Sequence, residues 1–224
     1  MPGTHLAAVG FYGKIPVLGD FVGRGLPASF VDPFDTWLRT GLAASRARLA
    51  DGWQDTYLTS PLWSFAIAAG CYGPAAAIGV LIPSVDRVGR YFPFTIVALV
   101  SYAVPPWPLL GANEAWLAKA GELALTVLGD AFELAGLESE IIALGDPAVP
   151  VSARSFERGV AAKEASPLLE ALAAAAPVGS MWSTDGGAGR APAILAFAGM
   201  PPAEAFSALL DGHLAACGIL ELTT

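Results

Sequence analysis

Charged side chains are scarce in this sequence, and basic ones are scarcer than acidic ones. Twelve Lys and Arg stand against twenty Asp and Glu in 224 residues, which gives a formal net charge of −8. The basic residues are spread thinly and form no run. A domain that tracks nucleic acid needs a basic face to neutralise phosphates. The composition therefore argues against nucleic-acid binding.

Cysteine and histidine are rare as well. Cys71 and Cys217 lie far apart, and His5 and His213 lie near opposite ends of the chain. A zinc site needs about four nitrogen or sulfur ligands in recognisable clusters. We therefore expect no metal and no cofactor, and we expect both thiols to be reduced and unligated in a reducing compartment.

The sequence also lacks the signals of export and of membrane insertion. Residues 1–5 carry no positive n-region of a secretory leader. Residues 56–85 and 91–113 hold no charge and are long enough to cross a bilayer, but Gly and Pro interrupt both stretches. Such punctuation is typical of short strands separated by turns. We expect a soluble, cytoplasmic protein that is not integral to the membrane.

Apolar material, in contrast, is plentiful, because 54% of the residues are hydrophobic. The length fits one domain over residues 1–224, since no linker divides the chain. Short connections among the middle strands predict an antiparallel meander. The predicted strands span residues 7–12, 63–69, 75–82, 94–102, 178–183 and 193–198.

Helical patterns alternate with these strands. Ser29 is expected to cap the first helix, whose apolar stripe is Phe30, Phe34, Trp37, Leu38 and Leu42. Further helices are predicted at 51–58, at 113–136 with Gly136 as the stop, at 166–177 and at 202–210. Residues 137–163 show no clear pattern. The order predicts an α/β fold, a three-layer α-β-α sandwich around a mixed, largely antiparallel sheet.

Two segments resemble catalytic motifs but fail in detail. Between Gly10 and Gly13 stand two residues where a phosphate-binding loop has four, and Ile15 follows Lys14 where that loop has a hydroxyl. Ser84 lacks the flanking glycines of a nucleophile elbow. A hydrolase that uses Ser84 with Asp86 and an unplaced base stays an alternative. We expect a binding protein and not an enzyme, because no activated nucleophile is recognisable.

Charged side chains cluster in the loop of residues 84–90, between two apolar strands. The cluster is either an ion-pair knot that fixes the loop or a recognition surface for a partner. We expect the loops that hold Lys14, Asp20, Asp86, Arg87, Arg90 and Asp185 to gather at one end of the sheet, because charges seldom stay buried without partners.

An aromatic side chain completes the candidate partner-binding set. Trp107 stands among Pro105, Pro106 and Pro108 and is the tryptophan expected to be most exposed. An exposed tryptophan is a typical anchor of protein contacts. The candidate partner-binding residues are Lys14, Asp20, Asp86, Arg87, Arg90, Trp107 and Asp185.

Several blocks of the sequence resemble the type VI secretion-associated TagF family. The opening signature is residues 10–22, GFYGKIPVLGDFV, and the first helix matches at 29–37, SFVDPFDTW. Two further blocks are 57–65, YLTSPLWSF, and 79–93, GVLIPSVDRVGRYFP. Later segments at 181–186 and 206–212 are similar too, so the resemblance spans nearly the whole chain.

The resemblance implies a cytoplasmic accessory protein of the secretion system. It implies a post-translational repressor that works by binding a scaffold protein with a forkhead-associated domain. Some members carry a fused phosphatase domain, for which 224 residues leave no room. The family supplies no catalytic residues to carry over. A structural subunit of the apparatus is the remaining alternative.

Overall fold

The computed structural model describes residues 6–101, 103–129, 132–150 and 178–213. Seven strands form one sheet in the order β2-β1-β5-β4-β3-β6-β7, and each pair of neighbours is antiparallel. The strands are β1 (Leu6–Gly13), β2 (Val22–Arg24), β3 (Trp63–Ile67), β4 (Ala76–Ile82), β5 (Phe94–Val100), β6 (Ser180–Thr184) and β7 (Ala193–Phe197).

The predicted meander is present at the centre of the sheet. β4 pairs with β3 on one side and with β5 on the other. All seven residues of β4 and all seven of β5 are buried. An unpaired charge on either strand would lose its hydration in this buried position. The sequence of β4 and β5 therefore carries no charged residue.

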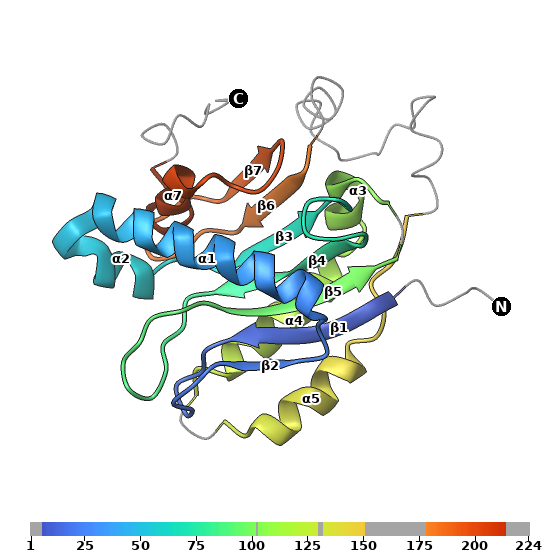
Figure 1. Cartoon of the computed structure of the whole chain (residues 1–224), viewed down its shortest axis with the longest axis horizontal. Coiled ribbons are helices and arrows are strands. Elements are labelled where there is room, and N and C mark those ends of the chain that lie inside the picture. Colours follow the sequence, from blue (N-terminus) through green and yellow to red (C-terminus); the bar gives the residue numbers. More distant parts are fainter. Residues whose placement is uncertain (1–5, 102, 130–131, 151–177, 214–224) are drawn as a thin grey trace.

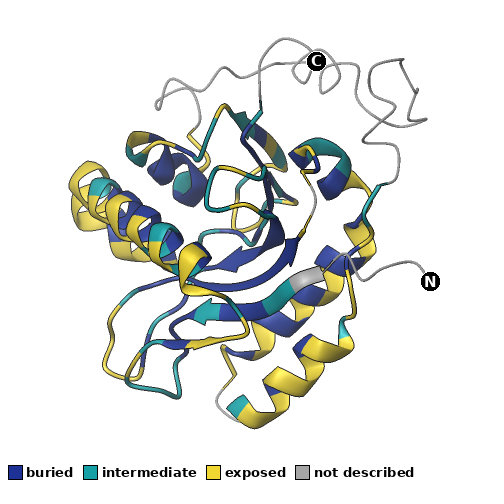
Figure 2. Ribbon diagram, turned by 45° about the vertical axis from the view of Figure 1, so that its right-hand side comes forward, coloured by how far each residue is buried: buried dark blue, intermediate teal, exposed yellow. Residues whose placement is uncertain are grey.

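Helices cover both faces of the sheet (Figure 1). One face packs against α1 (Ala28–Leu49), α2 (Trp53–Leu58) and α7 (Phe206–Asp211). The other packs against α3 (Pro106–Gly111), α4 (Glu114–Thr126) and α5 (Leu134–Ala143). Figure 2 shows the helices buried toward the sheet and exposed away from it. The predicted three-layer sandwich is confirmed, and within the described ranges the mixed sheet resolves to antiparallel pairs throughout.

The first helix has the predicted buried stripe but not the predicted cap. Phe30, Phe34, Trp37, Leu38 and Leu42 are all buried. The backbone N–H groups of residues 30 and 31 both donate to the carbonyl of Pro27, so the helix already begins at residue 28. The prediction of a Ser29 cap was wrong, because an N-cap residue precedes the first helical turn.

The helix predicted over 113–136 is α4 alone, which is shorter, and α5 begins close to the expected end. α4 ends at Thr126, and the backbone N–H groups of Leu128 and Gly129 donate to carbonyls three residues back. Such tightening is common where a helix terminates. Gly136 lies inside α5 and does not stop a helix. The predicted helix at 166–177 falls outside the described residues.

Three elements were not predicted, and two helices were located with small shifts. Most of α5 lies at 137–143, where the sequence shows no clear pattern. β2 has only three residues, and α3 replaces the connector expected at 105–111. The helix expected at 51–58 is the short 3-10 helix η1 (Ala50–Gly52) followed by α2. The last helix is η4 (Ala203–Ala205) followed by α7, and Gly212 closes it in the left-handed conformation at φ 76°.

Candidate functional site

Asp86 is the buried centre of an ion-pair knot, which we define as Lys14, Asp86 and Arg90. Lys14 Nζ donates to Asp86 Oδ2 at 2.8 Å, and Arg90 Nε donates to the same oxygen at 2.7 Å. The other oxygen accepts the backbone N–H groups of Val88 and Arg90 at 3.1 and 2.9 Å. Both carboxylate oxygens are thus satisfied, which is the condition for burying a charge.

The knot joins two loops that are far apart in the sequence. The backbone N–H of Arg87 donates to Leu18 O at 2.9 Å, and the Arg90 guanidinium donates to Gly19 O. Within the second loop, Gly89 takes φ +83° and its N–H donates to Asp86 O at 2.9 Å. Lys14, in the segment that resembled a phosphate-binding loop, therefore serves as the counterion of Asp86.

The environment of Asp86 determines its titration. Burial alone would raise the pKa of this carboxyl, since desolvation disfavours the charged form. The hydrogen bonds from Lys14 and Arg90 outweigh burial and hold the pKa of Asp86 below its ordinary value. Asp86 stays ionised at neutral pH and acts as a fixed point for both loops.

Ser84 does not show the arrangement of a hydrolase nucleophile. Its side chain is buried, and its hydroxyl has no hydrogen-bond partner among the described residues. Its backbone carbonyl accepts the Tyr57 hydroxyl at 2.9 Å. Asp86 is committed to the knot, and His213 lies next to Asp211 at 3.4 Å. The described part of the chain therefore brings no base to Ser84.

The remaining charged candidates of these loops face solvent. Arg87 is exposed, and its guanidinium forms no ion pair with a described residue. Asp20 is exposed and accepts the backbone N–H of Phe21 at 2.8 Å. The knot of Lys14, Asp86 and Arg90 thus acts as a structural device, and Arg87 is the cation left free on its surface.

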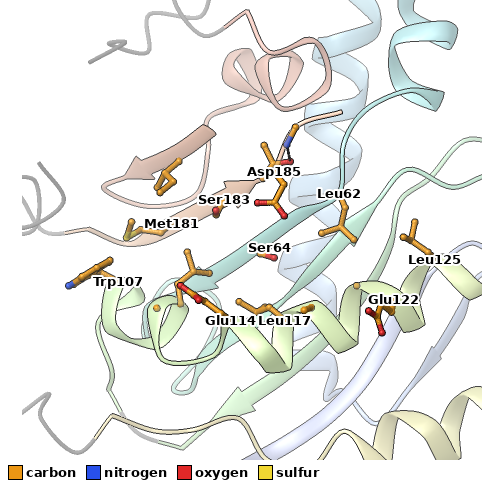
Figure 3. A pocket seen from close by; sticks show the side chains of 17 residues that line it. Leu62, Ser64, Trp107, Glu114, Leu117, Glu122, Leu125, Met181, Ser183 and Asp185 are labelled. Atoms are coloured by element: carbon orange, nitrogen blue, oxygen red, sulfur yellow. Dashed lines mark hydrogen bonds between the residues drawn. The ribbon is translucent and has the colours of Figure 1, made fainter. Parts of the chain in front are cut away.

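A second feature is an open groove on the α3–α4 side of the sheet (Figure 3). It encloses about 610 Å³ between α3, α4 and the strands β3, β6 and β7. Leu62, Leu117 and Met181 supply apolar surface. The lining residues are Leu62, Ser64, Trp107, Leu110, Gly111, Glu114, Leu117, Ala118, Gly121, Glu122, Leu125, Met181, Ser183, Thr184, Asp185, Gly186 and Ile194.

The charge of this groove has one sign. Glu114, Glu122 and Asp185 line it, and none of its described lining residues is Lys or Arg. Leu125 and Ile194 are 51% and 52% exposed, which is high for large apolar side chains. The groove thus offers an apolar surface with three exposed carboxylates to a ligand.

The candidate residues fall into two groups. The register pairs Gly13 and Ile82 with Phe94, Trp63 with Leu81, and Ser64 with Ser183. The loops after β1, β4 and β6 therefore emerge at one end of the sheet, as predicted. Asp185 nevertheless lies four strands from β1, which is about 19 Å at roughly 4.8 Å per strand. It belongs to the groove and not to the knot.

Trp107 is the least buried tryptophan, as predicted, because the other five are all buried. It lies on α3, which follows the opposite end of β5 from the charged loops. It is half-buried against the core, not fully exposed, because Pro106 at the first helical turn starts a helix that packs on the sheet. Trp107 lines the groove together with Asp185. The sequence singled out both residues but gave no signal that they share a surface.

The described residues contain no group of three or more His, Cys, Asp or Glu that could hold a metal ion. Cys71 is half-buried, its thiol lies 3.5 Å from Gly179 O, and burial raises its pKa. Cys217 lies outside the described ranges, so the redox state of both cysteines stays a prediction.

Residues 10–144 match the family described as TagF N-terminal domain, Type VI secretion system-associated. This match covers more than half of the chain. The chain belongs to the TagF family. The matched TagF region includes the knot and both helices that line one side of the groove, whereas β6 and β7 follow it. The resemblance read from the sequence blocks is thereby confirmed.

A solved structure extends the similarity beyond the matched TagF region. The chain is 37% identical to PA0076 from Pseudomonas aeruginosa PAO1, with a TM-score of 0.78. The similarity covers 96% of this chain and 97% of that one. A comparison with curated proteins finds no match. Among the helices that the structure describes, none is both long and apolar enough to cross a membrane.

Proposed function

We propose that this TagF chain is a cytoplasmic negative regulator of type VI secretion that binds a scaffold protein with a forkhead-associated domain and performs no turnover. Its family membership places it with the secretion system. The repressor role and the scaffold partner follow from the resemblance to studied members. If they hold, the chain must carry a surface that complements the binding surface of such a scaffold.

The groove is the observation that carries the proposal. Forkhead-associated domains recognise phosphorylated segments with Arg side chains, so their binding surface is basic. Glu114, Glu122 and Asp185 offer that surface three carboxylates. Leu125 and Ile194, each about half exposed, supply apolar contact area beside them. An unphosphorylated acidic chain can thus meet a surface adapted to phosphate.

The Ser84 environment supports binding over catalysis. A serine nucleophile needs a base within hydrogen-bond reach. The Ser84 hydroxyl is buried and has no such partner in the described part of the chain. Tyr57 and the ion-pair knot hold the loop that contains Ser84 in place. The polar groups of this loop therefore stabilise the fold.

Charge reversal on the groove tests the proposal. Glu122→Lys places a cation on an exposed wall of the groove and is expected to weaken scaffold binding about tenfold or more, as a disrupted charged contact does. Glu204→Lys, at an exposed helical site away from the groove, is the matched control with the same change in net charge. Calorimetric titration of the purified scaffold measures both variants.

A secretion assay links binding to function. In cells that lack the native gene, wild-type protein and Glu204→Lys are expected to repress secretion, and Glu122→Lys is expected to release it. Equal binding by the two lysine variants would exclude the groove as the docking surface. Loss of scaffold binding in Arg87→Ala, with an unchanged melting temperature, would move the site to the charged loops.

A further inference from the structure

A smaller hollow lies on the other face of the sheet, where α1 ends and α2 begins. It has a volume of about 490 Å³ and is lined by Arg46, Trp53, Gln54, Gly89, Arg90 and Tyr91. Arg46 comes from the last turn of α1, Trp53 and Gln54 from α2, and the other three from the loop that carries the knot. Two arginines and two aromatic rings thus meet from three segments.

Both guanidinium groups are held in place before any ligand arrives. Arg46 lies over the Trp53 ring at 4.3 Å from its centroid. The indole is itself fixed, since its Nε1 donates to Ser45 Oγ at 2.8 Å and its ring stacks on Tyr57 at 4.9 Å. Tyr91 meets Trp53 edge-on at 5.3 Å. Such rigid support lowers the entropy lost when a ligand binds.

Arg90 is fixed by different contacts. Its Nε donates to Asp86 and its terminal nitrogen to Gly19 O, yet 56% of its side chain remains exposed. A guanidinium has five N–H donors. Arg90 therefore keeps donors that can reach a ligand in the hollow.

The positive charge of the hollow is only partly neutralised. Arg46 forms no ion pair with any described residue. Asp86 is already shared between Lys14 and Arg90. None of the described residues that line the hollow carries a carboxylate. In a chain with a formal net charge of −8, this is a local surplus of cations.

We propose that this hollow binds an anionic oxygen group, phosphate or carboxylate, on an acidic segment of a partner protein. The fork of N–H donors on Arg46 and the donors that Arg90 has left suit the planar or tetrahedral oxygens of these groups. The half-buried Tyr91 ring offers apolar contact to the neighbouring residues of the segment, whereas the buried Trp53 ring supports Arg46. This site is separate from the groove and does not depend on the identity of the scaffold.

Three peptides test the proposal against the full chain by fluorescence anisotropy. One carries a phosphothreonine, one has glutamate at the same position and one has unmodified threonine. The first or the second is expected to bind more tightly than the third, and their ranking tells phosphate from carboxylate. Arg46→Gln is expected to weaken that binding about tenfold, the loss expected for a charge-assisted hydrogen bond.

Lys119→Gln on α4 is the matched control, because it removes one exposed positive charge outside the hollow. It is expected to change affinity by less than about twofold, since distant surface charges are screened. Arg46→Lys keeps the charge over Trp53 without the planar fork and is expected to lose less affinity than Arg46→Gln. Urea denaturation checks that each variant is folded.

Two results would overturn the proposal. One is equal affinity for all three peptides, and the other is equal weakening by Arg46→Gln and Lys119→Gln. The groove variant Glu122→Lys is expected to retain peptide binding. The groove variant reports on scaffold binding and the Arg46 variants report on peptide binding in the hollow. The two proposals can therefore fail independently of each other.

Discussion

At the scale of single residues, Asp86 shows how a buried charge can organise loops. Its carboxylate accepts four hydrogen bonds, two from side chains and two from the backbone. A buried ion pair of this kind adds little net stability to the fold, because the cost of removing the charges from water offsets their attraction. Its consequence is specificity: the loops after β1 and β4 meet in one arrangement, which positions Arg87 and Arg90.

Removal of the Asp86 charge is expected to destabilise the fold. Asp86→Asn keeps the shape of the side chain but leaves Lys14 buried without a counterion. Breaking one partner of a buried pair costs about 3–5 kcal/mol of the free energy of unfolding. Asp20→Asn, on an exposed side chain of the neighbouring loop, is expected to change it by less than about 0.5 kcal/mol. Urea denaturation at neutral pH measures both, and similar values would contradict the structural role of the knot.

The same carboxyl predicts how stability depends on pH. Because its pKa is lowered in the folded state, folding favours the ionised form. This contribution is fully present above the ordinary carboxyl value of about 4 and is lost as the pH falls through that value toward the lower folded-state pKa. The free energy of unfolding of the wild type should fall over this acid range. Asp86→Asn should show a flatter profile, and parallel profiles would assign the acid sensitivity to other groups.

At the scale of elements, α1 and α7 approach closely because Gly41 has no side chain. A Cβ at position 41 would lie 2.3 Å from Cδ2 of the buried Phe206 ring. Gly41→Ala is therefore expected to destabilise the fold by about 1–3 kcal/mol, the usual effect of overpacking. Gly136→Ala in α5 meets nothing within 4 Å and is expected to stabilise by about 0.5–1 kcal/mol, since alanine favours helix. Opposite shifts of the melting temperature would confirm the prediction, and a neutral Gly41→Ala would contradict it.

The long elements could be predicted from the sequence because their patterns are strong. Uncharged runs gave β3, β4 and β5, and the 3–4 spacing of Phe30, Phe34 and Trp37 gave α1. β2 was missed because three residues carry no period, and α3 because Pro105, Pro106 and Pro108 suggested a rigid connector. Gly136 was misjudged as a stop because glycine also occurs inside exposed helices.

The two halves of the candidate site differ in how far the sequence predicts them. Charges that interrupt apolar runs must find partners, so a cluster of Lys14, Asp86 and Arg90 was foreseeable. The groove was not, because it depends on β6 pairing with β3 across more than a hundred residues. Trp107 and Asp185 line the same groove only because β6 pairs with β3.

At the scale of the whole molecule, the two hollows on opposite faces of the sheet are lined by side chains of opposite charge. The groove on the α3–α4 side carries carboxylates without a basic residue among its described lining. The hollow on the α1–α2 side carries two arginines and, among its described lining residues, no carboxylate. A chain with a net charge of −8 thus keeps one small basic hollow on the face opposite an acidic groove. Two partners of opposite charge could bind at once without competing for space.

The net charge also predicts the kinetics of scaffold binding. An acidic chain that approaches a basic surface is steered by long-range attraction, and salt screens this attraction over about 10 Å at 0.1 M. The association rate constant is therefore expected to fall at least about tenfold between low and high ionic strength, while the dissociation rate constant changes less. Stopped-flow fluorescence with the purified scaffold measures both constants.

Glu122→Lys should reduce the salt dependence of association and also speed dissociation, because it alters the contact itself. Glu204→Lys should affect association only slightly and leave dissociation unchanged. An association rate that does not respond to salt would mean that apolar contact alone drives the encounter, and the acidic rim of the groove would then have no part in it.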